Sequence, residues 1–174
     1  MKSNYQTRAQ KFVRDFYPYI QNCYDRRAFQ QATNVFNYEH RRKVKMAYGM
    51  TRIAFITSDY VIKINFAKEK EMFERFGDCE QEIETYEEAE QDGYEYLFAK
   101  IERYEYMEHY FYIMPRVYGI GTREEDADCL VSDDEGNWLY EHVCDLHNKN
   151  YGWKNGHIVI FDYACSPDNR YFSV

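Results

Sequence analysis

The sequence predicts an α+β fold, because helical and strand patterns occur in separate blocks instead of alternating as β-α-β units. Apolar residues recur at helical spacing before residue 40 and again over 67–91, whereas they alternate with other residues over 44–66. Near the end of the chain, Asn155-Gly156 separates two short apolar runs, which is the strongest short-range signal for a β-hairpin.

The composition fits one folded domain. The chain has 174 residues, of which 45% are hydrophobic and 19% aromatic, so a substantial core is expected. The net charge is −8 and the only basic run, 41–45, is short, which argues against nucleic-acid binding. The absence of a long apolar segment and of a signal-peptide pattern favours a cytoplasmic protein without a membrane partner. The five cysteines have no paired spacing, which is typical of reduced thiols.

The expected elements follow from local periodicity and turn residues. The amino-terminal pattern is interrupted by Pro18 and predicts one or two helices that dock on another element. The elements, in chain order, are helices within 1–40, two strands within 44–66 with a turn at Ser58-Asp59, a helix over 67–91, strands at 94–101 and 110–117, an acidic loop at 121–136, a short helix at about 137–143, and the hairpin.

The hairpin brings polar residues together at its open end. Folding the chain about the Asn-Gly turn pairs Lys154 with His157, Gly152 with Val159, and Asn150 with Phe161. Asn150 and Asp162 then emerge side by side, and Asp145 lies on the loop that leads into the first strand. One amide and two carboxylates form an oxygen-rich site that suits a hard cation such as Mg²⁺ carrying phosphates.

Two other interpretations of this region stay open. Taken singly, Asp145 and Asn148 could cap turns while Asp162 ends a strand. A zinc site could also be built from two histidines and two cysteines, but their spacing is not a recognised ligand pattern. Those four residues are His142, Cys144, His147 and Cys165.

Three upstream residues could serve a phosphate site. Lys63 lies in an apolar strand segment, VIKI, where an ammonium is costly unless it meets a carboxylate or a phosphate; an edge-strand lysine is the alternative. Glu82 flanks the apolar face of the following helix and could supply that carboxylate, although most glutamates of such a helix face solvent. Gly49 precedes a strand and would allow close approach of a phosphate, or only mark a strand start.

The order of these residues resembles the protein-kinase-like fold over residues 45–165. The spelling Asp145-Leu146-His147 is similar to that of aminoglycoside- and choline-kinase relatives, and the whole looks like very small kinase-like proteins encoded by bacteriophages. The resemblance implies a single minimal domain spanning 1–174. Its parts would be a helical extension (1–43), an N-lobe-like antiparallel sheet plus one helix (44–117), and a strongly reduced C-lobe (118–174).

The resemblance also implies a role for each candidate residue, with ATP and Mg²⁺ as cofactors. Lys63 would hold the α- and β-phosphates of ATP, paired with Glu82, while Gly49 would lie over the phosphates. Asp145 would orient or deprotonate the acceptor hydroxyl. Asn150 and Asp162 would hold Mg²⁺. In the hinge, the backbone of Met114 and the three residues after it would contact adenine.

Several features depart from the family pattern. Only one glycine, Gly49, occurs in the phosphate-binding loop, which usually has several. The aspartate that would bind the metal, Asp162, is followed by Tyr163-Ala164 instead of Phe-Gly. Met114 and Asp145 are 31 residues apart, and only 12 residues follow Asp162, which leaves little room for a peptide-binding lobe. The sequence therefore predicts an ATP-dependent phosphotransferase with an unidentified acceptor, or a catalytically silent pseudokinase that binds nucleotide, a protein partner or a second copy. An α+β interaction protein with a coincidental motif is a third alternative.

Overall fold

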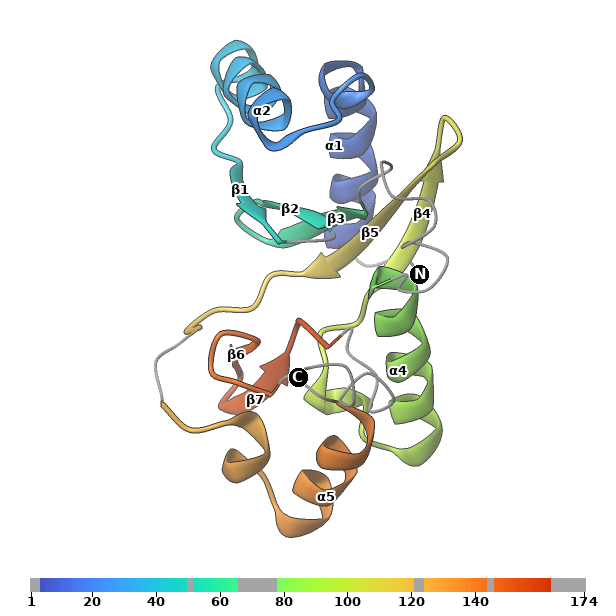
Figure 1. The fold of residues 1–174 in the computed structure, drawn as a ribbon, viewed down its shortest axis with the longest axis vertical. Coiled ribbons are helices and arrows are strands. Elements are labelled where there is room, and N and C mark those ends of the chain that lie inside the picture. The colour runs from blue at the N-terminus through green and yellow to red at the C-terminus, as the bar shows by residue number, and fades with distance from the viewer. Residues whose placement is uncertain (1–3, 50–51, 66–77, 121–123, 144–145, 164–174) are drawn as a thin grey trace. The chain divides into compact units, whose positions relative to one another are not determined.

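The structure is a computed structural model that describes residues 4–49, 52–65, 78–120, 124–143 and 146–163. It is a mixed α+β fold, as the sequence predicts (Figure 1). Contacts between residues divide the chain into two compact units. Unit 1 comprises Met1–Gly77 and Glu102–Arg116, and unit 2 comprises Asp78–Ile101 and Val117–Val174.

Unit 1 is built on a five-stranded antiparallel sheet with the order β1-β2-β3-β5-β4. Its strands are rich in β-branched and aromatic residues, which pack well on a pleated surface. The strands are β1 (Lys45–Tyr48), β2 (Arg52–Ile56), β3 (Tyr60–Asn65), β4 (Glu102–Tyr106) and β5 (His109–Pro115).

Two amino-terminal helices cover one face of this sheet (Figure 1). They are α1 (Asn4–Ile20) and α2 (Arg26–His40). The Asp25 side chain caps α2 by accepting a hydrogen bond from the Ala28 N–H at 2.9 Å. Phe16 lies at the centre of the core, with its ring 4.8 Å from those of Phe36 and Phe55. The expectation that these helices dock on another element is confirmed.

Unit 2 combines helices with a separate two-stranded hairpin. The Ser132 and Glu135 capping box starts helix α5, because each side chain accepts a hydrogen bond from the other residue's backbone N–H. The elements are α4 (Asp78–Asp92), the 3-10 helices η1 (Glu95–Leu97) and η2 (Ala127–Leu130), α5 (Asp133–His142), β6 (Tyr151–Lys154) and β7 (His157–Ile160).

Three sequence-based expectations are wrong. The segment 94–101 is not a strand: it holds η1 and then an extended connector whose Phe98 makes one isolated bridge to Ile160. Leu97, Phe98 and Ala99 are all buried. In a half-buried strand, buried and exposed side chains would alternate instead. The strand lies instead at β4, whose residues alternate between half-buried and exposed positions.

The boundaries of two other regions also differ from expectation. The acidic stretch over 121–136 contains η2 and the first turn of α5, because acidic residues favour a helix amino terminus. The segment 44–66 forms three strands, not two, and Pro18 lies inside α1, whose last residue is Ile20. Across the residues that the structure describes, we find no helix with the length and apolarity to cross a membrane.

Candidate functional site

The carboxy-terminal hairpin has the turn and register that its sequence predicts. Asn155 and Gly156 have φ angles of 53° and 84°, and a type I′ turn requires positive values at both positions. Lys154 pairs with His157, and two positions further Gly152 pairs with Val159. The strand pairing therefore fixes which residues leave the hairpin together.

Asn150 and Asp162 lie side by side at the open end of the hairpin. The backbone N–H groups of Phe161 and Asp162 both donate to the Asn150 carbonyl oxygen, at 2.9 and 3.3 Å. The Asn150 N–H in turn donates to the His147 carbonyl oxygen at 2.9 Å, which closes the preceding loop. Asn150 is buried and Asp162 is half-buried. The predicted convergence of these two residues is confirmed, whereas their roles are still predictions.

Glu82 joins this group from helix α4. It is fully buried, and its Oε1 accepts a hydrogen bond from the Tyr163 N–H at 3.3 Å, one residue beyond Asp162. A buried carboxylate needs such donors to offset the loss of hydration. Glu84 and Glu88 on the same helix are exposed. Burial therefore distinguishes Glu82 from its neighbours, which sequence spacing alone could not do.

Tyr163 anchors the chain directly after Asp162. Its side chain is fully buried, its hydroxyl donates to the Ala99 carbonyl oxygen at 3.0 Å, and its ring packs edge-on against Phe98 at 4.8 Å. The position of the Asp162 backbone is therefore held from both sides, by Asn150 and by Tyr163. The sequence gives no signal for this anchor, because a lone tyrosine after a strand has no preferred partner.

Gly152 is a second positioning residue that the sequence does not reveal. The Trp153 N–H donates to the Tyr118 carbonyl oxygen at 2.7 Å, so the chain that follows β5 passes close over β6. A Cβ atom on Gly152 would lie 2.3 Å from that same carbonyl oxygen and 2.6 Å from the Val117 side chain. Only glycine fits this contact, which holds β6 and thereby Asn150 in place.

Lys63 belongs to the sheet of unit 1. It lies on β3, between Ala54 of β2 and Tyr112 of β5, and its exposed fraction is 4%. Its neighbour Ile62 belongs to the core beneath α1 and α2, so Lys63 is on the opposite face of the sheet. The edge-strand alternative does not apply, because β3 is paired on both sides.

Gly49 and Met114 also lie in unit 1. Gly49 is in the β1–β2 connection, where its N–H donates to the Arg52 carbonyl oxygen at 2.9 Å. Met114 is fully buried in β5 and pairs with Val61. The pairing of β4 with β5 ends at Ile113, so Met114 is not paired with a residue of β4.

Three candidate residues of the metal and catalytic sites fall outside the part of the chain that the structure describes. These residues are Asp145, Cys144 and Cys165. Within the described part of the chain, no cluster of three or more histidine, cysteine or acidic residues could hold a metal ion. The pair of Asn150 and Asp162 offers an amide and a carboxylate, which are the hard oxygen donors that Mg²⁺ accepts.

Each unit thus presents groups that suit phosphate chemistry. Unit 2 joins Asn150 and Asp162 through their backbones, and unit 1 buries the lysine Lys63 in its sheet. Comparison of the chain with protein-family models, with curated proteins and with solved structures finds no match.

Proposed function

We propose that this chain is a minimal kinase-like protein that binds Mg-ATP and transfers a phosphoryl group to an acceptor still to be identified. The observation that carries the proposal is the convergence of Asn150, Asp162 and Glu82 at the hairpin of unit 2. Kinase-like sites use an asparagine and an aspartate to hold Mg²⁺ between phosphate oxygens. The side-chain oxygens of Asn150 and Asp162 would take that role, because the backbones of these two residues are hydrogen-bonded to each other.

The position of Lys63 supports the same proposal. Kinase-like proteins carry the phosphate-binding lysine on the third strand of an antiparallel sheet, with a glutamate on the next helix and a glycine-containing loop over the phosphates. Here Lys63 is on β3, Glu82 is on α4, and Gly49 directly follows β1. The variants described below test whether Lys63 and Asp162 act on the same nucleotide.

A nucleotide-binding pseudokinase is the second candidate. Between Val117 and Asn150, the described residues contain one α-helix, α5, which is ten residues long. A peptide acceptor would find few surfaces there to hold it. Nucleotide binding without transfer would fit this arrangement, with a protein partner or a second copy as the target.

Thermal unfolding with nucleotides tests whether the chain binds Mg-ATP. We expect ATP with Mg²⁺ to stabilise the protein by about 2.7 kcal/mol at a concentration about 100 times Kd, and ATP without Mg²⁺ to stabilise it less. The stabilisation by ADP would show whether binding requires the γ-phosphate, and the stabilisation by GTP would show whether it requires the adenine base. The absence of a shift with every nucleotide would overturn both candidates and leave an α+β interaction protein.

Variants test whether the proposed residues are responsible. Asp162→Ala and Lys63→Met should each remove most of the ATP-dependent stabilisation. Glu84→Ala on α4 and Lys45→Met on β1 remove exposed charges of the same kind and should retain it. If only one of the two site variants loses binding, Lys63 and Asp162 do not share a nucleotide.

Transfer is measured separately from binding. Release or transfer of the labelled γ-phosphate by the wild-type chain, and its loss in Asp162→Ala, would support the phosphotransferase. Mg-ATP stabilisation without any turnover would instead support the pseudokinase. Asp145→Asn then distinguishes catalysis from binding, because an acceptor-orienting aspartate should affect turnover and leave the ATP-dependent stabilisation unchanged.

A further inference from the structure

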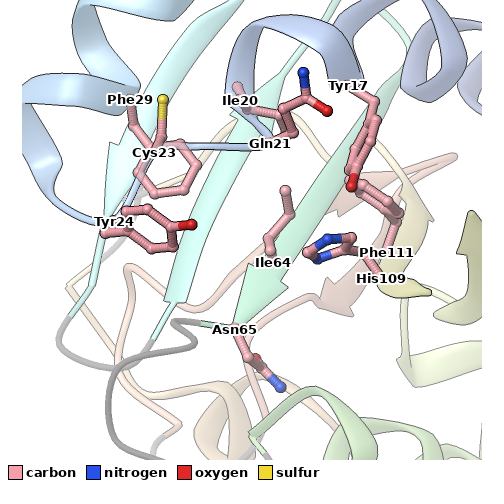
Figure 2. A pocket seen from close by; sticks show the side chains of 10 residues that line it. All are labelled: Tyr17, Ile20, Gln21, Cys23, Tyr24, Phe29, Ile64, Asn65, His109 and Phe111. Carbon is pink, nitrogen blue, oxygen red and sulfur yellow. The ribbon is translucent and has the colours of Figure 1, made fainter. Parts of the chain in front are cut away.

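Unit 1 contains a pocket at the carboxyl end of α1. Figure 2 shows that its walls come from the end of α1, the connection to α2 and the sheet beneath. Tyr17 and Ile20 belong to α1, Tyr24 to the connection, and Ile64 and His109 to β3 and β5. The lining residues are Tyr17, Ile20, Gln21, Cys23, Tyr24, Phe29, Ile64, Asn65, His109 and Phe111.

This pocket is separate from the groups assigned to the nucleotide. Ile64 follows Lys63 directly in β3, and consecutive residues of a strand point to opposite faces of the sheet. Ile64 packs on the core beneath α1 and α2, so the pocket opens on the helix-covered face. A ligand here would not compete with a nucleotide held by Lys63.

The lining determines what charge a ligand can carry. None of the ten lining residues is an aspartate, glutamate, lysine or arginine, so a charged ligand would lose its hydration without a counter-charge. Half of the lining residues carry aromatic rings, and flat apolar groups pack well against such walls. The pocket therefore favours an uncharged, partly apolar molecule.

Tyr17 supplies a polar group inside this apolar lining. Its side chain is more than nine-tenths buried, and burial raises the pKa of its hydroxyl. Among the residues that the structure describes, its hydroxyl bonds no other group, and it is not one of the fully buried polar atoms, so it remains accessible at the pocket. Figure 2 shows the hydroxyls of Tyr17 and Tyr24 on either side of the Ile64 side chain. Tyr17 is thus available to a ligand's hydroxyl or carbonyl group.

The size of the pocket limits the ligand to one ring. Its volume is about 70 Å³. A cavity of about 150 Å³ encloses benzene, and about 10–15 Å³ admits one water molecule. A single ring could therefore enter with one edge and leave the other at the mouth, beside the exposed Gln21 and Tyr24. Larger fused rings would not be enclosed.

We propose that this pocket binds an uncharged single-ring aromatic molecule that carries a hydroxyl or amide group. The ring packs against Phe29, Ile64 and Phe111, and the polar group bonds the Tyr17 hydroxyl. Cys23 contributes only its surface, because its thiol already donates to the Tyr19 carbonyl oxygen at 3.5 Å.

Phenol and toluene are suitable probes, because they share one ring and a substituent of similar size, a hydroxyl in phenol and a methyl in toluene. Titration of the full chain, followed by amide chemical shifts in NMR spectra, should move the signals of Tyr17, Ile64 and His109 at up to about 10 mM phenol, a range expected for so small a ligand. Phenol should bind about tenfold more tightly than toluene. Benzoate, which is charged, should bind more weakly than either.

Two variants make the test specific. Tyr17→Phe should weaken phenol binding to the level of toluene and leave toluene unchanged, which a merely structural role for Tyr17 would not produce. Ile64→Phe should fill the pocket and abolish both, whereas Val35→Phe on the exposed surface of α2 should abolish neither. If phenol leaves the three signals unmoved, or binds wild type and Tyr17→Phe equally, the proposal is wrong.

Discussion

At the scale of single residues, two glycines of this chain have different structural importance. Gly152 lies under the Tyr118 carbonyl oxygen, and an added Cβ would be 2.3 Å from it. Gly49 lies in the β1–β2 connection, where an added Cβ would be 3.5 Å from the Arg52 carbonyl oxygen, an ordinary contact. The first glycine is thus required by packing, and the second is not.

Alanine substitution should separate these two cases. We expect Gly152→Ala to lower the free energy of unfolding by about 3 kcal/mol, because the backbone contact must open and the hydrogen bond from Trp153 is lost. Gly49→Ala should change it by less than about 0.5 kcal/mol. Urea denaturation measures both. A Gly152→Ala protein as stable as wild type would show that β6 and the chain above it are not in contact.

The pair formed by Glu135 and Tyr96 predicts a pH dependence. Hydrogen bonds from Ser132 and Tyr96 hold the pKa of Glu135 below its usual 4.5, and the Glu135 carboxylate raises the pKa of Tyr96 to about 12. Because the Glu135 pKa is lowered by folding, its contribution to stability is present above the unfolded value and is lost as the pH falls through the folded value.

NMR titration of the Glu135 carboxyl carbon tests this prediction directly. We expect a midpoint below 4.5 in wild type and a higher midpoint in Tyr96→Phe, which removes one donor. Glu135→Gln should lose less stability than wild type between pH 6 and pH 3. An unchanged midpoint in Tyr96→Phe would show that the two side chains do not bond in solution.

At the scale of secondary-structure elements, helix α4 carries unfavourable charge. It has no basic residue in its last turn, and Glu84, Glu88 and Asp92 follow one another at spacings of four. Like charges at this spacing repel, and acidic groups near a helix carboxyl end oppose the helix dipole. The fully buried Glu82 lies on the same helix. The helix that positions this candidate site residue is therefore destabilised by its own surface charges.

Charge reversal at Glu88 should therefore stabilise the protein. Glu88→Lys replaces two repulsive pairs by attractive ones and should raise the free energy of unfolding by about 1 kcal/mol. Glu88→Gln should give about half of that gain. Both gains should shrink in 1 M salt, where surface charges are screened over about 3 Å. A gain that is independent of salt would assign the effect to helix propensity instead.

The elements also show how far the sequence predicts this fold. The hairpin could be predicted because Asn-Gly determines both turn type and register, and register alone brings Asn150 to Asp162. β4 could not be predicted, because its five residues are all charged or tyrosine, and its inner face is only half-buried, with Tyr104 and Tyr106 against the core. The choice of Glu82 among several glutamates depends on burial in the folded chain, which helical spacing does not determine.

At the scale of the whole molecule, charge is divided between the two units. Unit 1 holds 17 lysines and arginines against 10 acidic residues, a net charge of +7, while unit 2 holds 5 against 20, a net charge of −15. The overall charge of −8 conceals this division. Within unit 2, repulsion among acidic groups opposes the compact state. In unit 1, opposite charges such as Lys11 and Asp15 pair at 2.8 Å.

Salt should therefore slow amide exchange in unit 2 and should not slow it in unit 1. Screening weakens the repulsion in unit 2, so amide protons of α4 should exchange about threefold more slowly at 0.5 M than at 0.02 M sodium chloride. Amide protons of α1 should exchange at the same rate or faster, because its ion pairs are weakened. Native-state hydrogen exchange, corrected for intrinsic rates, measures both helices in one sample. Faster exchange of α4 at high salt would contradict the prediction, because it would mean that repulsion among acidic groups does not limit the stability of this helix.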